Sequence, residues 1–469
     1  MLFSSMTFIY VFLPIVLLLY LISKKELHNP ILLIASIIFY AWGEPKYLAI
    51  MLITILVNYL GAIGIEKYDK FRKPILILTV IADLGFLFYF KYFDFVLSNI
   101  NSIFNCDISL LKIVMPIGIS FYTFQAMSYL IDVYRKEVKA QKDIYKLALY
   151  ICLFPQLVAG PIVKYHDIED AIDNREVSFE KVSYGVKRFI IGLSKKVLIA
   201  NTMAAVADKI FVQNPQNFDH LTAWLGAVAY TFQIYFDFSG YSDMAIGLGA
   251  IFGFKFLENF NYPYISKSVT EFWRRWHISL STWFRQYVYI SLGGNRNGLF
   301  KTCRNLGIVF LLTGIWHGAN WTFIVWGLWS AVFIIIEKLL NIKEFESKPH
   351  SIWVEGARHI FCILFFIIGW VIFRADSLAY ALKYLANMFG CLAVNPENII
   401  YDITYYVDNI EIITFVAALI LSVPLFKNIL EVRTKGKLAL VNIWLLVLLV
   451  LSTASLAAGT YNPFIYFRF

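Results

Sequence analysis

"LLTGIWHGANWTFIVWGLW" (residues 311–329) contains nineteen residues, no formally charged side chain and one histidine, His317. A run of about 20 apolar residues is long enough to cross the hydrocarbon core of a bilayer as an α-helix. An imidazole ring needs hydrogen-bond partners, and its burial away from water is costly without them. This stretch therefore predicts a membrane segment, and it marks His317 as a residue whose presence needs a reason.

The composition of the whole chain is also typical of a membrane protein. Of its 469 residues, 59% are hydrophobic and only 16% are charged, and the mean hydropathy is +0.65. Soluble domains carry about 25% charged residues. Backbone groups in lipid must be satisfied within helices or closed barrels. Because the apolar runs here are continuous rather than alternating, we predict an all-α polytopic membrane protein.

Apolar runs recur along the entire chain. The run 305–340 is too long for one span and should form two, which gives about 11–13 spans in total. No internal repeat is visible, which argues against a transporter built from inverted halves. The opening run precedes its positive charges and lacks a cleavage site, so we interpret it as a retained span. The candidate spans are 3–23, 30–42, 47–65, 74–92, 112–132, 146–163, 186–206, 222–254, 305–340, 353–373, 411–426 and 438–459.

Clusters of Lys and Arg predict the orientation, because such clusters favour cytoplasmic loops. Both termini should then be extracytoplasmic, in a bacterial inner membrane. The net charge of +9 fits cytoplasmic loops and anionic lipids better than nucleic acid. Five scattered cysteines indicate neither a disulfide framework nor a metal cluster. The Lys and Arg clusters that predict cytoplasmic loops are Lys24 and Lys25; Lys67, Lys70, Arg72 and Lys73; Arg135, Lys136 and Lys139; and Arg433, Lys435 and Lys437.

The segment 268–298, "SVTEFWRRWHISLSTWFRQYVYISLGGNRNG", is too polar to span a membrane. At helical spacing, aromatic and aliphatic side chains fall on one face and polar side chains on the other. We predict an amphipathic helix at the membrane surface, and a simple anchoring role is an open alternative for its arginines. The polar face would contain Arg274, His277, Ser281 and Arg285.

His317 is the leading candidate for chemistry. It could be a structural histidine that donates to a neighbouring carbonyl. Ionisable residues within a membrane are nevertheless functional candidates by default, and histidine suits proton transfer near neutral pH. Gly314, Gly318 and Asn320 would allow a close, polar approach to its ring. His277 alone is a weaker candidate, because a histidine between arginines at a surface is often merely solvated.

The stretch 235–253, "YFDFSGYSDMAIGLGAIFG", places Asp237 and Asp243 in an otherwise uncharged helical run. One interpretation is that both carboxylates brace helices through hydrogen bonds; the alternative is a proton or cation pathway. Its glycines predict close helix packing. Two other stretches, 116–125 and 154–165, contain Pro and Gly at membrane depth, and such breaks are tolerated where the backbone faces protein or a water-filled cavity.

Several catalytic signatures are missing from the chain. It has no GxSxG elbow, P-loop, GxGxxG, HExxH or zinc-type Cys/His spacing. An enzyme with this sequence would need neither a resident metal nor an elbow serine. A histidine base that acts on bound reactants would suffice.

Long stretches of the chain resemble the membrane-bound O-acyltransferases, in particular the branch that O-acetylates bacterial polysaccharides such as alginate and peptidoglycan. The resemblance covers nearly the whole chain. Its most specific part is residues 235–296 followed by "GIWHGANWTFIVWG" (314–327). "PIGISFYTFQAMSYLIDVYR", "FPQLVAGPI" and "FRADS" also fit.

The resemblance implies a ring of helices around a thinned centre with a reaction tunnel, and it places His317 at that centre. His277 matches a second polar position of the family. Ser239, Trp316 and Asn320 would line the tunnel with Asp237 and Asp243. Arg274, Arg275 and Arg285 could hold the phosphates of a cytoplasmic acetyl-CoA donor, although contact with lipid headgroups is an equal interpretation.

The C-terminal "FIYFRF" resembles a motif of the same branch, in which Tyr466 could accept the acyl group transiently. An interfacial aromatic anchor is the alternative for this tyrosine. We expect a core at 1–437 and a final helix with its tail at 438–469. The branch also implies a separate extracytoplasmic SGNH-type transferase as partner.

One competing function belongs to a different class. A multi-span transporter or flippase could use Asp237, Asp243 and His317 as a proton relay. The missing repeat argues against this alternative, and the long acyltransferase-like run argues against it more strongly.

Overall fold

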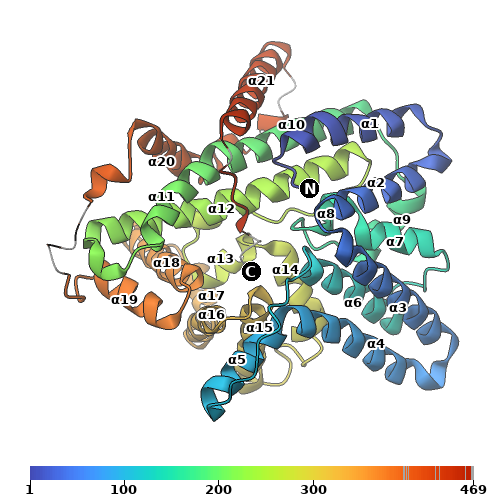
Figure 1. The fold of residues 1–469 in the computed structure, drawn as a ribbon, viewed down its shortest axis with the longest axis horizontal. Helices are drawn as coiled ribbons and strands as arrows, with labels where there is room; N and C mark the ends of the chain where they lie inside the picture. Colours follow the sequence, from blue (N-terminus) through green and yellow to red (C-terminus); the bar gives the residue numbers. More distant parts are fainter. Residues whose placement is uncertain are drawn as a thin grey trace. The chain divides into compact units, whose positions relative to one another are not determined.

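A computed structural model describes residues 1–394, 397, 399, 401–427, 429–431, 434–459 and 461–465. Two residues used above, Arg433 and Tyr466, lie outside the described residues. Every regular element in the described part is a helix (Figure 1). Six of the described helical stretches are long and apolar enough to cross a membrane. The prediction of an all-α, multi-span chain is therefore confirmed.

The described chain forms two compact units. Unit 1 comprises Met1–Ile190 and Tyr241–Glu258, and unit 2 comprises Ile191–Gly240 and Asn259–Phe469. Two helices, α10 (Phe179–Ser194) and α12 (His220–Ile251), contribute residues to both units.

Unit 1 is built mostly from apolar helices of the N-terminal half, which differ in length. Helix α3 packs on α4 and α6, and α2 packs on α7. A Cβ on Gly61 of α3 would lie 2.6 Å from Thr79 Oγ1 of α4, so a small residue is needed at this crossing. The helices are α1 (Leu13–Ile22), α2 (His28–Gly43), α3 (Leu48–Lys67), α4 (Arg72–Leu87), α5 (Phe93–Phe104), α6 (Ile119–Arg135), α7 (Ile144–Cys152), α8 (Phe154–Leu157) and α9 (Tyr165–Asn174).

The two Pro/Gly-broken stretches do not form the continuous spans expected over 112–132 and 146–163. Helix α6 starts only at Ile119, after Gly118 with a positive φ of 76°, and the second stretch divides into α7 and α8. A Cβ on Gly118 would lie 2.7 Å from the carbonyl oxygen of Leu157. The two breaks therefore pack against each other inside unit 1, which agrees with the rule that broken backbone at this depth faces protein.

Unit 2 contains the C-terminal helices and the histidine-bearing segments. They are α11 (Asn201–Phe211), α13 (Val269–Arg275), α14 (Ile278–Phe284), α15 (Leu299–His317), α16 (Trp321–Leu339), α17 (Ile342–Glu346), α18 (Ile352–Arg374), α19 (Leu378–Met388), α20 (Asn409–Leu421) and α21 (Lys435–Ala458). Helix α21 includes most of the predicted last span.

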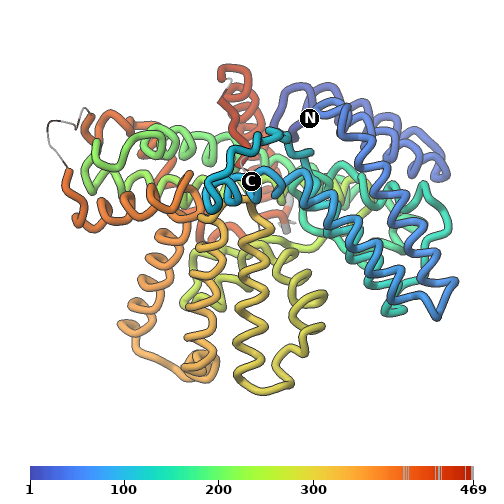
Figure 2. The backbone as a smooth tube through the Cα atoms, turned by 60° about the horizontal axis from the view of Figure 1, so that its bottom comes forward, coloured from blue at the N-terminus to red at the C-terminus, as the bar shows by residue number. Residues whose placement is uncertain are grey.

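The long run 305–340 forms two helices, as predicted. Helices α15 and α16 make an antiparallel hairpin and lie side by side (Figure 2). A Cβ on Gly314 would lie 2.5 Å from the carbonyl oxygen of Phe323, and one on Gly327 would meet the carbonyl of Phe310. Only glycine lets the two backbones approach this closely. His317 is the last residue before the turn of this hairpin, and Asn320 is the last residue of the turn.

Candidate active site

His317 is the last residue of α15, and its side chain is buried. The helix ends there because Gly318 is extended and Asn320 caps the next helix, accepting the N–H of Thr322 at 3.0 Å. The imidazole meets Trp326 of α16 and Phe373 of α18 edge to face, with ring centroids 5.0 and 5.2 Å apart. The uncharged neighbourhood of His317 is thus an aromatic box supplied by three helices.

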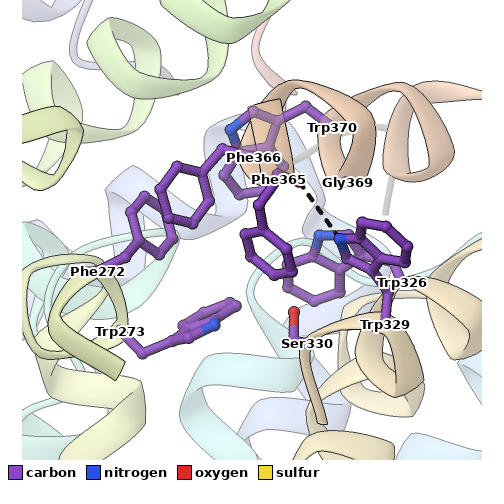
Figure 3. Close-up of a pocket in the computed structure, with 9 residues that line it drawn as sticks. All are labelled: Phe272, Trp273, Trp326, Trp329, Ser330, Phe365, Phe366, Gly369 and Trp370. Carbon is purple, nitrogen blue, oxygen red and sulfur yellow. Dashed lines mark hydrogen bonds between the residues drawn. The ribbon is translucent and has the colours of Figure 1, made fainter. Parts of the chain in front are cut away.

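An aromatic wall extends this box along unit 2. Figure 3 shows residues of this wall around a small cavity, contributed by α13, α16 and α18; all but Ser330 and Gly369 are aromatic. The rings of Trp326 and Trp370 are stacked, with centroids 5.8 Å apart. The Trp329 indole donates to the carbonyl of Phe365 at 3.3 Å. The cavity between these residues is about 10 Å³, enough for about one water molecule. The wall is therefore a packed support that orients the box around His317.

His277 lies at a break in the chain rather than on the polar face of one helix. The structure divides the predicted amphipathic helix into α13, α14 and a π-helical turn at Arg285–Tyr289. His277 has a left-handed backbone (φ 47°) and is buried, 1% exposed. This geometry is strained for a non-glycine residue. The expectation of a continuous helix with a surface-facing His277 is wrong, because the strained turn directs the ring inward.

The side chain of His277 is held by a residue that the sequence did not single out. Asn259 Oδ1 lies 3.2 Å from His277 Nδ1. The ring also meets Phe238 edge to face at 4.6 Å. Burial lowers the pKa of His277 to about 3, so the ring is neutral throughout the physiological range.

Trp316 connects the two histidines. Its indole centroid lies 6.0 Å from the His277 ring and 4.9 Å from the His317 ring. Residues forty positions apart in sequence therefore flank the same buried indole. This brings together three predicted site residues: His277, Trp316 and His317.

Glu337 of α16 fixes the segment that precedes His277. Its carboxylate accepts the backbone N–H groups of Val269 and Thr270, at 2.7 and 2.8 Å, at the start of α13. An acidic group at a helix N-terminus satisfies otherwise unpaired donors and interacts favourably with the helix dipole. Sequence reasoning missed Glu337, although a buried acid in an apolar helix was an available signal.

Asp237 forms a buried ion pair. Its Oδ1 lies 2.8 Å from Lys196 Nζ, and both side chains are 2% exposed. Lys196 also donates to Asn201 Oδ1 at 2.8 Å and to the carbonyl oxygen of Pro463. Asp237 Oδ2 accepts the backbone N–H of Ile465 at 2.9 Å. The bracing interpretation of Asp237 fits this geometry, and the braced element is the C-terminal segment.

Further contacts hold the same segment inside unit 2. Asn201 Nδ2 donates to Asn462 at 3.2 Å, and the Tyr461 hydroxyl donates to Asp208 at 2.6 Å. Ile465 is buried. Sequence reasoning missed Lys196; a lysine within the apolar run 186–206 was the signal that could have identified it.

Asp243 belongs to unit 1, whereas Asp237 belongs to unit 2. Asp243 pairs with Arg188 at 2.6 Å, and Arg188 also pairs with Glu258 at 2.6 Å. Ser239 is buried. Asn320 donates to the carbonyl of Asp376 at 3.0 Å besides capping α16. Two of the predicted tunnel residues, Asp243 and Asn320, thus have evident structural partners.

The three predicted donor-binding arginines have different surroundings. Arg274 and Arg285 are exposed. Arg275 pairs with Glu271 at 2.8 Å and donates to the carbonyl of Asn261 at 3.1 Å. The charge of Arg275 is therefore partly balanced by Glu271 of the same helix, whereas the charged groups of Arg274 and Arg285 are exposed.

A separate polar cluster in unit 1 centres on His166 of α9. Its Nδ1 lies 2.9 Å from Asp132 and its Nε2 lies 3.3 Å from Asp167. These hydrogen bonds raise the pKa of His166 to about 9. The cluster therefore behaves as an ion-pair bridge between α6 and α9.

Comparison with known proteins shows which family carries this site. Residues 34–374 match the profile of the MBOAT, membrane-bound O-acyltransferase family. The chain is 42% identical over its full length to the full-length probable alginate O-acetylase AlgI of Pseudomonas putida. The chain belongs to the membrane-bound O-acyltransferase family. The resemblance drawn from the sequence is thus confirmed, and the protein is a multi-pass membrane O-acyltransferase.

Other relatives of this MBOAT protein act on different polymers by name. It is 34% identical to the peptidoglycan O-acetyltransferase of Helicobacter pylori, over 91% of this chain and 87% of the relative. It is 29% identical to the teichoic acid D-alanyltransferase of Bacillus subtilis, over 55% of this chain and 68% of the relative. Acyl transfer is common to these names, whereas the acyl group and the polymer differ.

Proposed function

We propose that this MBOAT protein takes an acetyl group from acetyl-CoA on the cytoplasmic side and passes it across the bacterial inner membrane for O-acetylation of a cell-surface polysaccharide. The support is its high identity to a named alginate O-acetylase, together with a buried histidine in an aromatic box. Both termini would be extracytoplasmic, and an extracytoplasmic SGNH-type transferase would complete the transfer.

His317 would act as the general base. An incoming hydroxyl oxygen attacks the thioester carbonyl carbon, the new C–O bond forms, and the C–S bond breaks. The hydroxyl proton passes to His317 and then to the departing thiolate. General-base catalysis contributes about 10²–10⁴-fold to such a step, and positioning in a closed site adds to it.

Tyr466 would be the first acceptor of the acetyl group. The observation that carries this step is the contact between the neighbouring residue and a buried ion pair: the N–H of Ile465 donates to Asp237, which pairs with Lys196. A C-terminal segment held by two buried charges has a defined position inside unit 2. The anchoring of these described residues, which directly precede Tyr466, supports a role for Tyr466 as acceptor rather than only as a lipid anchor.

The donor phosphates would be held at the cytoplasmic mouth of the proposed tunnel. Arg274 and Arg285 are exposed and can form charge-assisted hydrogen bonds with phosphate oxygens. Arg275 would add positive charge while it remains bound to Glu271. Lipid phosphates offer the same chemistry, so competition between acetyl-CoA and anionic lipid would separate the two roles.

The test is acylation of the purified protein. Wild type, Tyr466→Phe and Tyr145→Phe would be incubated with radiolabelled acetyl-CoA and examined by intact mass and peptide mapping. Tyr145 is the control because it is exposed and lies far from the C-terminal segment in sequence. We expect label on Tyr466 in wild type and in Tyr145→Phe, and none in Tyr466→Phe. Label on Tyr466→Phe equal to that on wild type would move the acceptor elsewhere. If wild type is unlabelled, transfer to a polysaccharide fragment with the partner present is measured instead.

A further inference from the structure

Asn259 makes an unusual set of contacts with the turn that carries His277. Its side chain is fully buried, and its Oδ1 accepts from Ser279 N at 3.1 Å and from Ser279 Oγ at 2.9 Å. Its backbone carbonyl accepts the N–H of Ile278 at 3.0 Å. One residue thus holds the backbone immediately after His277 at two points.

These contacts decide which way the Asn259 amide faces. A backbone N–H can only donate, so the atom 3.1 Å from the Ser279 nitrogen must be the amide oxygen. The same oxygen lies 3.2 Å from His277 Nδ1. An amide oxygen only accepts, so His277 Nδ1 must carry the hydrogen.

The protonated Nδ1 determines the character of the other ring nitrogen. In a neutral imidazole with hydrogen on Nδ1, Nε2 carries a lone pair and is an acceptor. Nε2 of His277 is buried and finds no hydrogen-bond partner among the described residues. A buried acceptor without a partner is costly, and a catalytic role is one of the reasons for which native structures keep such a group.

The position of this acceptor relates it to the reaction. Trp316 lies against both His277 and His317, so the acceptor belongs to the same aromatic site as the proposed base. A neutral ring with a strongly lowered pKa is a poor proton acceptor near pH 7 but a good hydrogen-bond acceptor. The two histidines therefore suit different tasks.

We propose that Asn259 is a positioning residue that holds His277 as its Nδ1–H tautomer, so that Nε2 accepts a hydrogen bond from an N–H or O–H group of a bound reactant. This inference rests on the proposed acyl transfer. In that reaction His317 takes the proton, and His277 only orients a reactant. The group that donates to Nε2 is an amide N–H or a hydroxyl of the thioester arm, because the single hydrogen of the acceptor hydroxyl goes to His317.

The tautomer can be measured independently of activity. We would label the histidines of the full-length protein with ¹⁵N, assign His277 by comparison with His277→Gln, and record two-bond ¹⁵N–¹H correlations. Wild type should show a protonated Nδ1 and an unprotonated Nε2. Asn259→Ala should shift the ring towards the Nε2–H tautomer, which imidazole favours in water. An Nε2–H tautomer in wild type would overturn the inference, even if acyl transfer were fully confirmed.

Kinetics provide the second readout. Asn259→Asp keeps the accepting oxygen but adds a negative charge, which should raise the pKa of His277 into the working range. Protonated His277 cannot accept at Nε2, so the loss of activity at low pH should begin at a higher pH in this variant than in wild type. Asn387→Asp is the control, because Asn387 is equally buried but its side chain donates to the carbonyls of Pro215 and Phe218 and not to the turn that carries His277. An unchanged pH profile in folded Asn259→Asp would contradict the proposal.

The same kinetics identify the reactant group. In His277→Phe, a roughly 10–100-fold rise in KM for acetyl-CoA would assign the hydrogen bond to the thioester arm. A similar rise confined to the KM of the acceptor would contradict this assignment. An unchanged kcat and KM for both substrates would show that Nε2 contacts neither and would overturn the proposal.

Discussion

Lys196 and Asp237 form an ion pair of 2.8 Å that is almost completely removed from solvent. Breaking one side of such a pair leaves an uncompensated charge, which costs about 3–5 kcal/mol. We therefore expect Asp237→Leu to lower the thermal stability of the purified protein strongly. Replacing both residues, as Lys196→Met with Asp237→Leu, should recover most of that loss.

The same double variant separates folding from function. It removes the contacts to the backbone of Pro463 and Ile465 while it keeps an apolar interior. We expect a stable protein that no longer acylates Tyr466. If the double variant acylates Tyr466 at the wild-type rate, the ion pair has only a structural role.

The α15–α16 crossing gives a prediction with a matched control on one helix. A Cβ on Gly314 would lie 2.5 Å from a backbone carbonyl, whereas a Cβ on Gly307 would meet no atom within 4 Å. Gly314→Ala should destabilise the protein by about 1–3 kcal/mol through overpacking. Gly307→Ala should be neutral or slightly stabilising, because alanine favours a helix. Thermal unfolding in detergent measures both, and equal effects would contradict the close crossing.

Glu337 should matter for the position of α13. Replacing it by alanine leaves the N–H groups of Val269 and Thr270 without their acceptor, which costs about 1–3 kcal/mol for the buried N–H of Val269 and less for the part-buried N–H of Thr270. Glu337→Gln keeps one accepting oxygen and should lose less. We expect transfer activity to follow the same order, because α13 leads into His277. Full activity in a folded Glu337→Ala variant would show that α13 needs no such anchor.

The His166 bridge predicts a pH dependence of stability. The folded-state pKa of His166, about 9, is raised above the ordinary value of 6.5 by Asp132 and Asp167. The contribution of His166 to the free energy of unfolding is therefore fully present below about pH 6.5. This contribution is lost as the pH rises through about 9. The difference in unfolding temperature between wild type and His166→Gln should shrink over this interval. A difference that stays constant from pH 6 to pH 10 would contradict the bridge.

Much of the fold could be predicted from the sequence because apolar continuity is a local property. The division of 305–340 into two helices followed from length alone, and the aromatic surroundings of His317 are contributed partly by its neighbours Trp316 and Trp326. The interpretation of the Pro/Gly stretches as breaks agrees with the structure, since those residues act on the local backbone, although the continuous spans expected across them were wrong.

The rest depends on contacts between residues distant in sequence. Helical spacing placed His277 on a polar face, but its left-handed turn is stabilised by Asn259, eighteen positions earlier. Lys196 is forty-one positions from Asp237 along the chain, and its second partner, Pro463, lies near the C-terminus. Periodicity within one segment carries no information about such partners.

The central claim is that His317 takes the proton in acyl transfer from a thioester. The most direct measurement compares wild type, His317→Ala and His317→Gln in one assay, with radiolabelled acetyl-CoA, the extracytoplasmic partner and a polysaccharide fragment. We expect transfer to fall by at least about 10²-fold in both variants, with unfolding temperatures close to that of wild type. Transfer that persists undiminished in His317→Ala would contradict the account.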